Sequence, residues 1–152
     1  MTPDKTIAIE SLAQEDVAAL FNLLQMSGLP VDGLDKHLHT ALVAKSGDEI
    51  VGSAALEMYG GSALLRSVAV TEARRGTGLG RQIMEAAIGV AQQHKLQRVY
   101  LLTETAADWF PRFGFAPIAR SAVDLAVQQS VEFTSACPTS AQVMLLEFAA
   151  SD

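Results

Sequence analysis

The sequence contains a single cysteine, Cys137, among its 152 residues. One thiol cannot close an internal disulfide, and it excludes a metal site built from several cysteines. No apolar run approaches the roughly 18 residues that a membrane-spanning helix requires. The N-terminal residues also lack the basic start and the apolar stretch of a signal peptide. We therefore expect a cytoplasmic protein with no membrane partner.

Charged residues are scarce, at 18% of the chain, and acidic residues outnumber basic ones to give a net charge of −6. Excess negative charge repels phosphate backbones, which argues against a nucleic-acid partner. His37 and His39 lie close in sequence, but no further ligands are spaced to complete a metal site. Apolar residues make up 49%, which excludes disorder. We predict a single metal-free domain over residues 1–152, since one domain typically has about 100–200 residues.

Apolar periodicity predicts a mixed succession of strands and helices. A helix is expected after Ser11 and Gln14, which fit a capping box, and further helices over 79–95 and 106–113. Strands are expected at 6–10, 40–45, 50–59, 62–70, 98–103, 116–119 and 143–148. Tight turns around Gly47 and at Gly60 make three of these strands antiparallel neighbours, and the long helix then links two others. The order predicts an α+β, or mixed α/β, fold.

A glycine-rich turn in front of the long helix is the most informative segment. Its glycines and arginines are Gly76, Gly78, Gly80, Arg74, Arg75 and Arg81. The glycines let a ligand approach the backbone without meeting a Cβ. A helix N-terminus offers unpaired N–H groups and the positive end of its dipole, so this turn predicts a pyrophosphate site. Neither the Walker loop nor the dinucleotide fingerprint has this spacing. The alternative is that the glycines only let the helix pack close to a sheet.

The stretch from Arg75 to Gly80 resembles the [Q/R]-x-x-G-x-[G/A] signature of the Gcn5-related N-acetyltransferase (GNAT) superfamily. Val68-Ala69-Val70 is similar to the end of that family's fourth strand, and Phe113-Gly114-Phe115 is similar to the segment after its fourth helix. The resemblance extends over nearly the whole chain. It implies a central, largely antiparallel sheet of about six or seven strands flanked by helices.

A closer resemblance is to bacterial N-acetyltransferases of arsenic-resistance operons, which act on the glutamate analogues arsinothricin and phosphinothricin. Residues 64–68, 100–110 and 130–141 carry it. It implies transfer of acetyl from acetyl-CoA, without a metal, to the α-amine of a small anionic amino-acid-like substrate, with antibiotic resistance as the role. Two alternatives stay open: another small amine, amino acid or peptide N-terminus as acceptor, and a non-catalytic module that binds acetyl-CoA. Homodimers are common among the relatives, and the closing strands could pair across chains.

The resemblance also assigns residues to acetyl-CoA. The main chain of Val68, Ala69 and Val70 pairs with the pantetheine arm, as an added strand would. The turn, with its backbone N–H groups, holds the pyrophosphate. The residues implied there are Arg74, Arg75, Gly76, Thr77, Gly78, Leu79, Gly80 and Arg81, and Thr105 is placed in the same cofactor set. Solvated surface charge is the alternative for each arginine, and a helix cap is the alternative for Thr105.

For catalysis, the resemblance implies direct attack of the amine on the thioester, with a main-chain N–H at Val68 polarising the carbonyl. The family's usual proton donor, a tyrosine, is replaced by Phe110, and its frequent glutamate base is replaced by Leu64. Glu57 and Glu104 are the remaining candidate bases, each acting through water. An exposed carboxylate is the alternative for both.

Arg66 is the candidate substrate residue. Strand alternation places residues 64, 66, 68 and 70 on one face, which lines the site in relatives. Burying an arginine within an apolar strand is costly unless it meets an anion, and a guanidinium binds carboxylates in bidentate fashion. A structural ion pair with Glu57 or another acid is the alternative. Thr103 and Cys137 are weaker candidates for substrate contact or proton donation, with a small buried hydrophobe as the alternative for Cys137.

Overall fold

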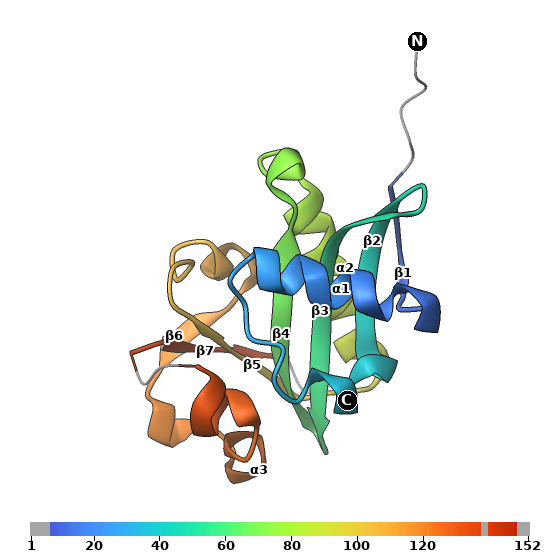
Figure 1. Cartoon of the computed structure of the whole chain (residues 1–152). Coiled ribbons are helices and arrows are strands. Elements are labelled where there is room, and N and C mark those ends of the chain that lie inside the picture. Colours follow the sequence, from blue (N-terminus) through green and yellow to red (C-terminus); the bar gives the residue numbers. More distant parts are fainter. Residues whose placement is uncertain (1–6, 138–139, 149–152) are drawn as a thin grey trace. The chain divides into compact units, whose positions relative to one another are not determined.

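The structure, a computed structural model, describes residues 7–137 and 140–148 (Figure 1). Hydrogen bonds join the seven strands of these residues in the order β1-β2-β3-β4-β5-β7-β6. Contacts group the chain into two compact units: one runs to Ala55 and over Ser67–Ile88, and the other covers Leu56–Arg66 and the chain from Gly89 onward. The mixed sheet with its helices confirms the predicted α+β class.

The first four strands are β1 (Ile7–Ser11), β2 (Ala41–Ser46), β3 (Glu49–Tyr59) and β4 (Ser62–Val70). β2 pairs antiparallel with both β1 and β3. The turns that separate β2, β3 and β4 contain Gly47 with φ 63° and Gly60 with φ 65°, values that glycine adopts without strain. The predicted hairpins are therefore confirmed. Position 6 of the expected first strand lies outside the described residues.

Helix α1 (Val17–Met26) runs over β2 and β3 of the first unit (Figure 1). Its Leu20, Leu23 and Leu24 belong to one buried cluster with strand residues that include Val43. The capping box predicted at Ser11 was wrong, because Ser11 ends β1 and a 3₁₀ turn over Gln14–Asp16 leads into the helix without a side-chain cap. Strand pairing of residue 11 with β2 takes precedence over the local capping pattern.

Helix α2 (Leu79–Gln93) connects β4 to β5 (Arg98–Thr103). β5 pairs parallel with β4 through Ser62 and Arg98. A parallel pair needs a long crossover connection, which the helix supplies. The predicted strand–helix–strand unit is therefore confirmed, and β5 has the predicted bounds.

The second unit ends with β6 (Ala116–Ile118), α3 (Leu125–Gln128), a π-helix over Glu132–Ala136, and β7 (Gln142–Glu147). β7 pairs antiparallel with β5 and β6. The helix predicted over 106–113 was too long: a single 3₁₀ turn spans Phe110–Phe113 and ends at Gly114, whose φ is 97°. Among the helices of the described residues, none has the length and apolarity that a membrane span needs.

Candidate active site

The glycine-rich turn leads from the end of β4 into α2. Gly76 and Gly78 have φ angles of 78° and 88°, which residues with a Cβ rarely adopt. A Cβ added at either position would meet no heavy atom within 4 Å. These two glycines therefore serve the backbone conformation and leave the space before them open. Close helix–sheet packing occurs instead at Gly52, where a Cβ would lie 2.4 Å from Cδ1 of Ile83.

Arginines flank this turn, and their contacts differ. Arg74 donates from Nη2 to the hydroxyl of Ser46 at 3.0 Å. Arg75 donates from Nε to the carbonyl oxygen of Val70 at 3.2 Å, so both side chains are directed by protein contacts near the turn. Arg81 forms an exposed ion pair with Glu85 one helical turn away. The positive charge predicted for the turn is thus present on the first unit.

A hollow of about 330 Å³ lies beside the turn and is lined by Ile7, Arg74, Thr77, Leu79 and Gln82. Three of these lining residues, Arg74, Thr77 and Leu79, were predicted to contact the cofactor. Thr77 donates its hydroxyl to the carbonyl of Arg74 at 2.5 Å, which closes the turn. Gln82, one turn into α2, also lines the hollow and was not among the predicted residues. An open glycine turn with an arginine at its side fits a pyrophosphate.

Ser67 interrupts β4. It has a φ of 60°, uncommon for a residue other than glycine within a strand, and its carbonyl accepts the hydroxyl of buried Ser53 at 2.7 Å. The expected alternation of residues 64, 66, 68 and 70 on one face requires a regular strand, and the positive φ of Ser67 departs from that geometry between positions 66 and 68. Val68, Ala69 and Val70 follow Ser67 at the strand's end. This irregularity left no sign in the sequence pattern.

Arg66 lies at the centre of a buried charge cluster in the second unit. Its Nη1 is 2.7 Å from Oε2 of Glu57, and its Nε is 3.3 Å from Oε2 of Glu132. Side-chain exposure is 0% for Arg66, 1% for Glu57 and 6% for Glu132. The ion pair with Glu57, the alternative to a free substrate-binding arginine, is confirmed. Glu132 was missed, since nothing in the local sequence connects it to β4.

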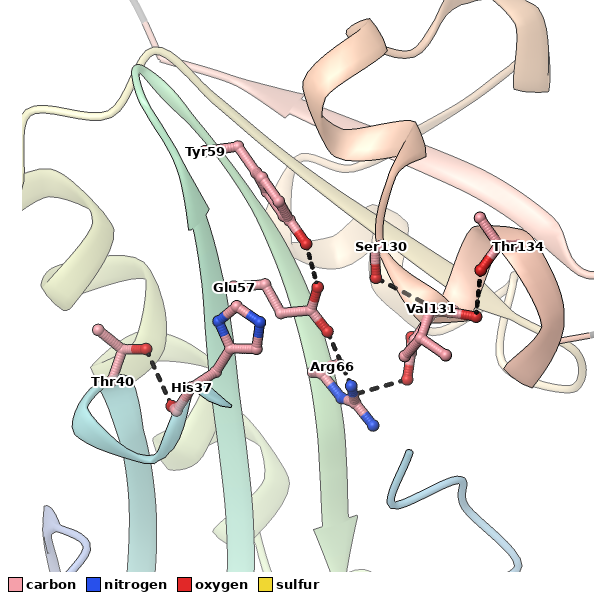
Figure 2. Close-up of polar contacts among 9 residues, drawn as sticks. His37, Thr40, Glu57, Tyr59, Arg66, Ser130, Val131 and Thr134 are labelled. Atoms are coloured by element: carbon pink, nitrogen blue, oxygen red, sulfur yellow. Dashed lines mark hydrogen bonds and ion pairs between the residues drawn. The ribbon is translucent and has the colours of Figure 1, made fainter. Parts of the chain in front are cut away.

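Tyr59 and Ser130 complete this cluster. Figure 2 shows the Glu57 carboxylate between the hydroxyl of Tyr59, which donates at 2.5 Å, and the guanidinium of Arg66. Burial alone would raise the pKa of the Glu57 carboxyl, but hydrogen bonds from Tyr59, Ser130 and Arg66, together with the Arg66 charge, lower it. Burial and the neighbouring Glu57 raise the pKa of Tyr59 to about 12. The alternative interpretation of Glu57 as an exposed carboxylate is therefore wrong, and the lowered pKa makes Glu57 a weaker base.

Cys137 follows the π-helix and is partly buried. Burial, together with the nearby charges of Glu132 and Glu104 and a hydrogen bond to Glu132, raises the pKa of its thiol to about 12. A thiol with so high a pKa stays protonated at neutral pH and is a poor nucleophile. Its place beside Glu132 connects it to the cluster around Arg66.

The remaining predicted residues fall in or after β5. Glu104 and Thr105 are exposed just beyond the strand end. The alternative of a helix cap at Thr105 is wrong, because the 3₁₀ turn begins only at Phe110 and has no side-chain cap. Oγ1 of Thr103 accepts the backbone N–H of Ala106 at 3.0 Å. Phe110, at the position of the family's tyrosine, is buried and makes an edge contact with Phe115.

Leu64, at the position of the family's glutamate, is fully buried with Tyr100 and Val143 in the apolar core of the second unit. Neither Leu64 nor Phe110 carries an acid or base. Among the described residues, no group of histidine, cysteine, aspartate and glutamate side chains could hold a metal ion.

A family model described as an acetyltransferase (GNAT) domain matches residues 37–117, more than half of the chain. The chain belongs to the GNAT acetyltransferase family. Members of this family are acyltransferases that use acetyl-CoA as cosubstrate. The matched segment contains both the glycine-rich turn and Arg66, so both lie within the family domain.

Individual relatives agree with this membership. The chain is 30% identical over 91 residues to CT2212, an uncharacterized N-acetyltransferase of Chlorobaculum tepidum. That match covers 59% of this chain and 58% of the relative, so it spans less than two thirds of the curated protein. Rv2747 of Mycobacterium tuberculosis, solved in complex with CoA and NLQ, is 25% identical with a TM-score of 0.79, over 93% of this chain and 99% of that one.

The N-acetylglutamate synthase of Neisseria gonorrhoeae, solved with coenzyme A and N-acetyl-glutamate, shares the fold. Its TM-score is 0.80 at 15% identity, over 95% of this chain and 36% of that chain. At this identity the likeness concerns the fold alone. The arrangement of strands around the glycine-rich turn is therefore one that solved GNAT structures also have.

Proposed function

We propose that this chain is a single-domain, cytoplasmic N-acetyltransferase that acetylates the α-amine of a small anionic amino-acid-like substrate. The substrate class is a glutamate analogue such as arsinothricin or phosphinothricin, and acetylation would confer resistance to it. One observation carries the acetyl-CoA part: the turn with Gly76 and Gly78 in left-handed conformations opens to free space beside Arg74. The CoA bound to Rv2747, a relative at 25% identity, supports the same cosubstrate.

The turn's own chemistry defines how it would hold acetyl-CoA. The first N–H groups of α2, from Leu79 onward, have no partners within the helix and favour an anion. Arg74 and Arg75 are directed by Ser46 and Val70 and add charge beside these groups. The backbone of Val68 to Val70 at the end of β4 would pair with the pantetheine arm. Thr105 remains in this set as an exposed side chain beyond β5.

Acetyl-CoA, when bound, supplies the thioester carbonyl that the substrate amine attacks. The backbone N–H of Val68 would stabilise the charge that develops on the carbonyl oxygen. Glu104 is the better candidate base, because it is exposed, whereas Glu57 is committed to Arg66 and Tyr59 and has a lowered pKa. Glu104 would accept the proton of the substrate amine through a water molecule. The CoA thiolate, with an ordinary thiol pKa of about 8.5, is a good enough leaving group to need no protein acid. The replacement of the family's tyrosine by Phe110 is therefore compatible with the reaction.

The substrate part of the proposal depends on Arg66. Arginine is the residue best suited to bind a carboxylate or phosphinate through two parallel hydrogen bonds. Arg66 directly precedes Ser67 on β4 and lies within residues 64–68, one of the three stretches that resemble the arsenic-resistance enzymes. Thr103 and Cys137 would lie at the edge of the same substrate region.

The first experiment measures thiol release from acetyl-CoA with phosphinothricin, glutamate, a polyamine and no amine. We expect release with phosphinothricin at a KM in the micromolar to millimolar range, typical of enzymes. Release with other amines only would keep the acetyltransferase and reject the glutamate-analogue substrate. The absence of turnover with every amine, together with tight acetyl-CoA binding, would favour a non-catalytic module, for which buried Phe110 and Leu64 are the specific observation.

A matched pair of variants tests the substrate residue. Arg66→Lys keeps the positive charge but cannot form the bidentate contact, so it should raise the KM for phosphinothricin while the KM for acetyl-CoA stays unchanged. The expected rise in the KM for phosphinothricin corresponds to a loss of about 1.5–3 kcal/mol of binding free energy, the usual contribution of a hydrogen bond to a charged group. Equal effects on both substrates would assign Arg66 a structural role only.

A further inference from the structure

Two carboxylates share one guanidinium in the buried cluster of the second unit. Arg66 donates to Glu57 at 2.7 Å and lies 3.3 Å from Glu132. With both carboxylates ionised, these three side chains carry a net charge of −1 while none of them is more than 6% exposed. Burying two carboxylates around one guanidinium has a large desolvation cost, so the arrangement is of interest beyond its contribution to stability.

The two carboxylates differ in their contacts with Arg66 and in the elements that hold them. Glu57 belongs to strand β3, makes the shorter contact, and also accepts the hydroxyl of Tyr59. Glu132 makes the longer contact, is hydrogen-bonded to the Cys137 thiol, and begins a π-helix of only five residues. Short π-helical turns occur frequently at functional sites. Glu132 is therefore the partner that Arg66 can exchange.

Charge balance favours exchange over addition. A substrate monoanion that joined the cluster while both carboxylates stayed would bring its charge to −2. A substrate monoanion that replaced Glu132 would leave the cluster's charge unchanged and let the displaced carboxylate return to water. The Nε–H edge of Arg66, which faces Glu132, belongs to the planar fork that matches a carboxylate or phosphinate.

We propose that Glu132 occupies the position of the substrate's anionic group on Arg66 and so sets the affinity for anionic acceptors. When such an acceptor binds, its anion takes the Nε edge of Arg66, Glu132 leaves, and Glu57 holds the guanidinium in place. Glu132 is thus a specificity-determining residue that competes with the substrate. This inference rests on the proposed function, because it assumes an anionic acceptor.

Calorimetric titration of phosphinothricin into the full chain saturated with CoA tests the competition. Glu132→Gln removes the competing charge but keeps the side chain's size, so it should tighten binding by about tenfold. Thr134→Ala is the matched control: it lies on the same π-helix, is exposed, and donates only to the nearby Val131 carbonyl (Figure 2). This control should leave the dissociation constant unchanged.

Kinetics separate this effect from a general loosening of the structure. Glu132→Gln should lower the KM for phosphinothricin and leave the KM for acetyl-CoA unchanged. If the glutamine variant does not fold, Glu132→Asp retracts the carboxylate by one methylene and should shift the same constants in the same direction. An unchanged or weakened affinity in the folded variants would overturn the competition.

Failure of the Glu132 competition can be distinguished from failure of the proposed function. If the wild-type chain acetylates phosphinothricin but Glu132→Gln does not bind it more tightly, only the role of Glu132 is rejected. If the wild-type chain acetylates other amines, and neither it nor Glu132→Gln binds phosphinothricin or glutamate, the anionic substrate class is rejected together with the competition. New binding of phosphinothricin by Glu132→Gln alone would support the competition.

Discussion

Arg66 of β4 and Glu57 of β3 form an ion pair of 2.7 Å in which neither side chain is more than 1% exposed. The loss of either partner therefore changes a buried charge balance. Because Glu132 also contacts Arg66, the two losses are not equivalent. Removal of Arg66 leaves two buried carboxylates without their cation, whereas removal of the Glu57 charge leaves one cation and one anion.

This asymmetry predicts that the loss of Arg66 destabilises the chain more than the loss of the Glu57 charge. Arg66→Met should lower the free energy of unfolding by about 3–5 kcal/mol, the usual cost of leaving buried charge uncompensated. Glu57→Gln should cost less, about 1–3 kcal/mol for weakened charged hydrogen bonds. Urea unfolding of both variants measures the order. Equal losses, or a larger loss for Glu57→Gln, would contradict the two-carboxylate arrangement.

The lowered pKa of Glu57 predicts how stability depends on pH. Hydrogen bonds and the Arg66 charge bring the folded-state pKa of this carboxyl below its ordinary 4.5, against the effect of burial. The unfolded chain therefore binds the proton more readily, so the stabilisation is present above pH 4.5 and is lost as the pH falls below it. Unfolding free energies measured from neutral to acidic pH should fall less steeply for Glu57→Gln than for the wild type. Parallel curves would contradict this.

Gly78 and Gly89 form a matched pair for the glycine-rich turn. Gly78→Ala places a Cβ on a residue with φ 88° and should cost about 1–2 kcal/mol. Gly89→Ala lies inside α2 with nothing within 4 Å, and should stabilise the chain by about 0.5–1 kcal/mol through helix propensity. Under the proposed function, only Gly78→Ala should also raise the KM for acetyl-CoA. A raised KM in both variants would point to a general effect on the helix.

The arginines around the turn should contribute unequally to acetyl-CoA binding. Arg74 lines the hollow and is directed by Ser46, whereas Arg81 is 76% exposed and paired with Glu85. Arg74→Ala should raise the KM for acetyl-CoA about tenfold at low salt, and the difference from wild type should shrink as salt screens the charge. Arg81→Ala should have a smaller effect. A reversed order would move the phosphate contacts to the helix face that carries Arg81.

The raised pKa of Cys137 predicts low thiol reactivity. Burial and the charges of Glu132 and Glu104 raise it from 9.0 to about 12, so at pH 8 the thiolate fraction is roughly a thousandfold below that of an ordinary cysteine. Iodoacetamide should alkylate the folded chain far more slowly than the same chain in urea. From pH 9 toward 12 the unfolded chain releases this proton first, so the group lowers stability as the pH rises. Rapid alkylation of the folded chain would contradict the burial of the thiol.

Local patterns predicted most of the elements because each has a local physical cause. The hairpin turns contain glycines with positive φ, and the long helix has a buried stripe that includes Ile83 and Ala87. The segment after β6 was missed, since α3 has four residues and the π-helix five, too few for a periodic signal. The alternation predicted around Arg66 assumed a regular strand. No residue type in β4 indicates the positive φ that Ser67 adopts.

The sequence by itself determined the order of the strands and of the two long helices, the glycine-rich turn with its arginines, and the absence of an acid or base at positions 110 and 64. These follow from residue type and spacing within a few positions. Only the tertiary structure decided what Arg66 meets. Glu57 reaches it from the neighbouring strand, and Glu132 reaches it from a position far along the chain. Such pairing depends on packing between distant segments, and the charge of a lone arginine does not specify which carboxylates will surround it.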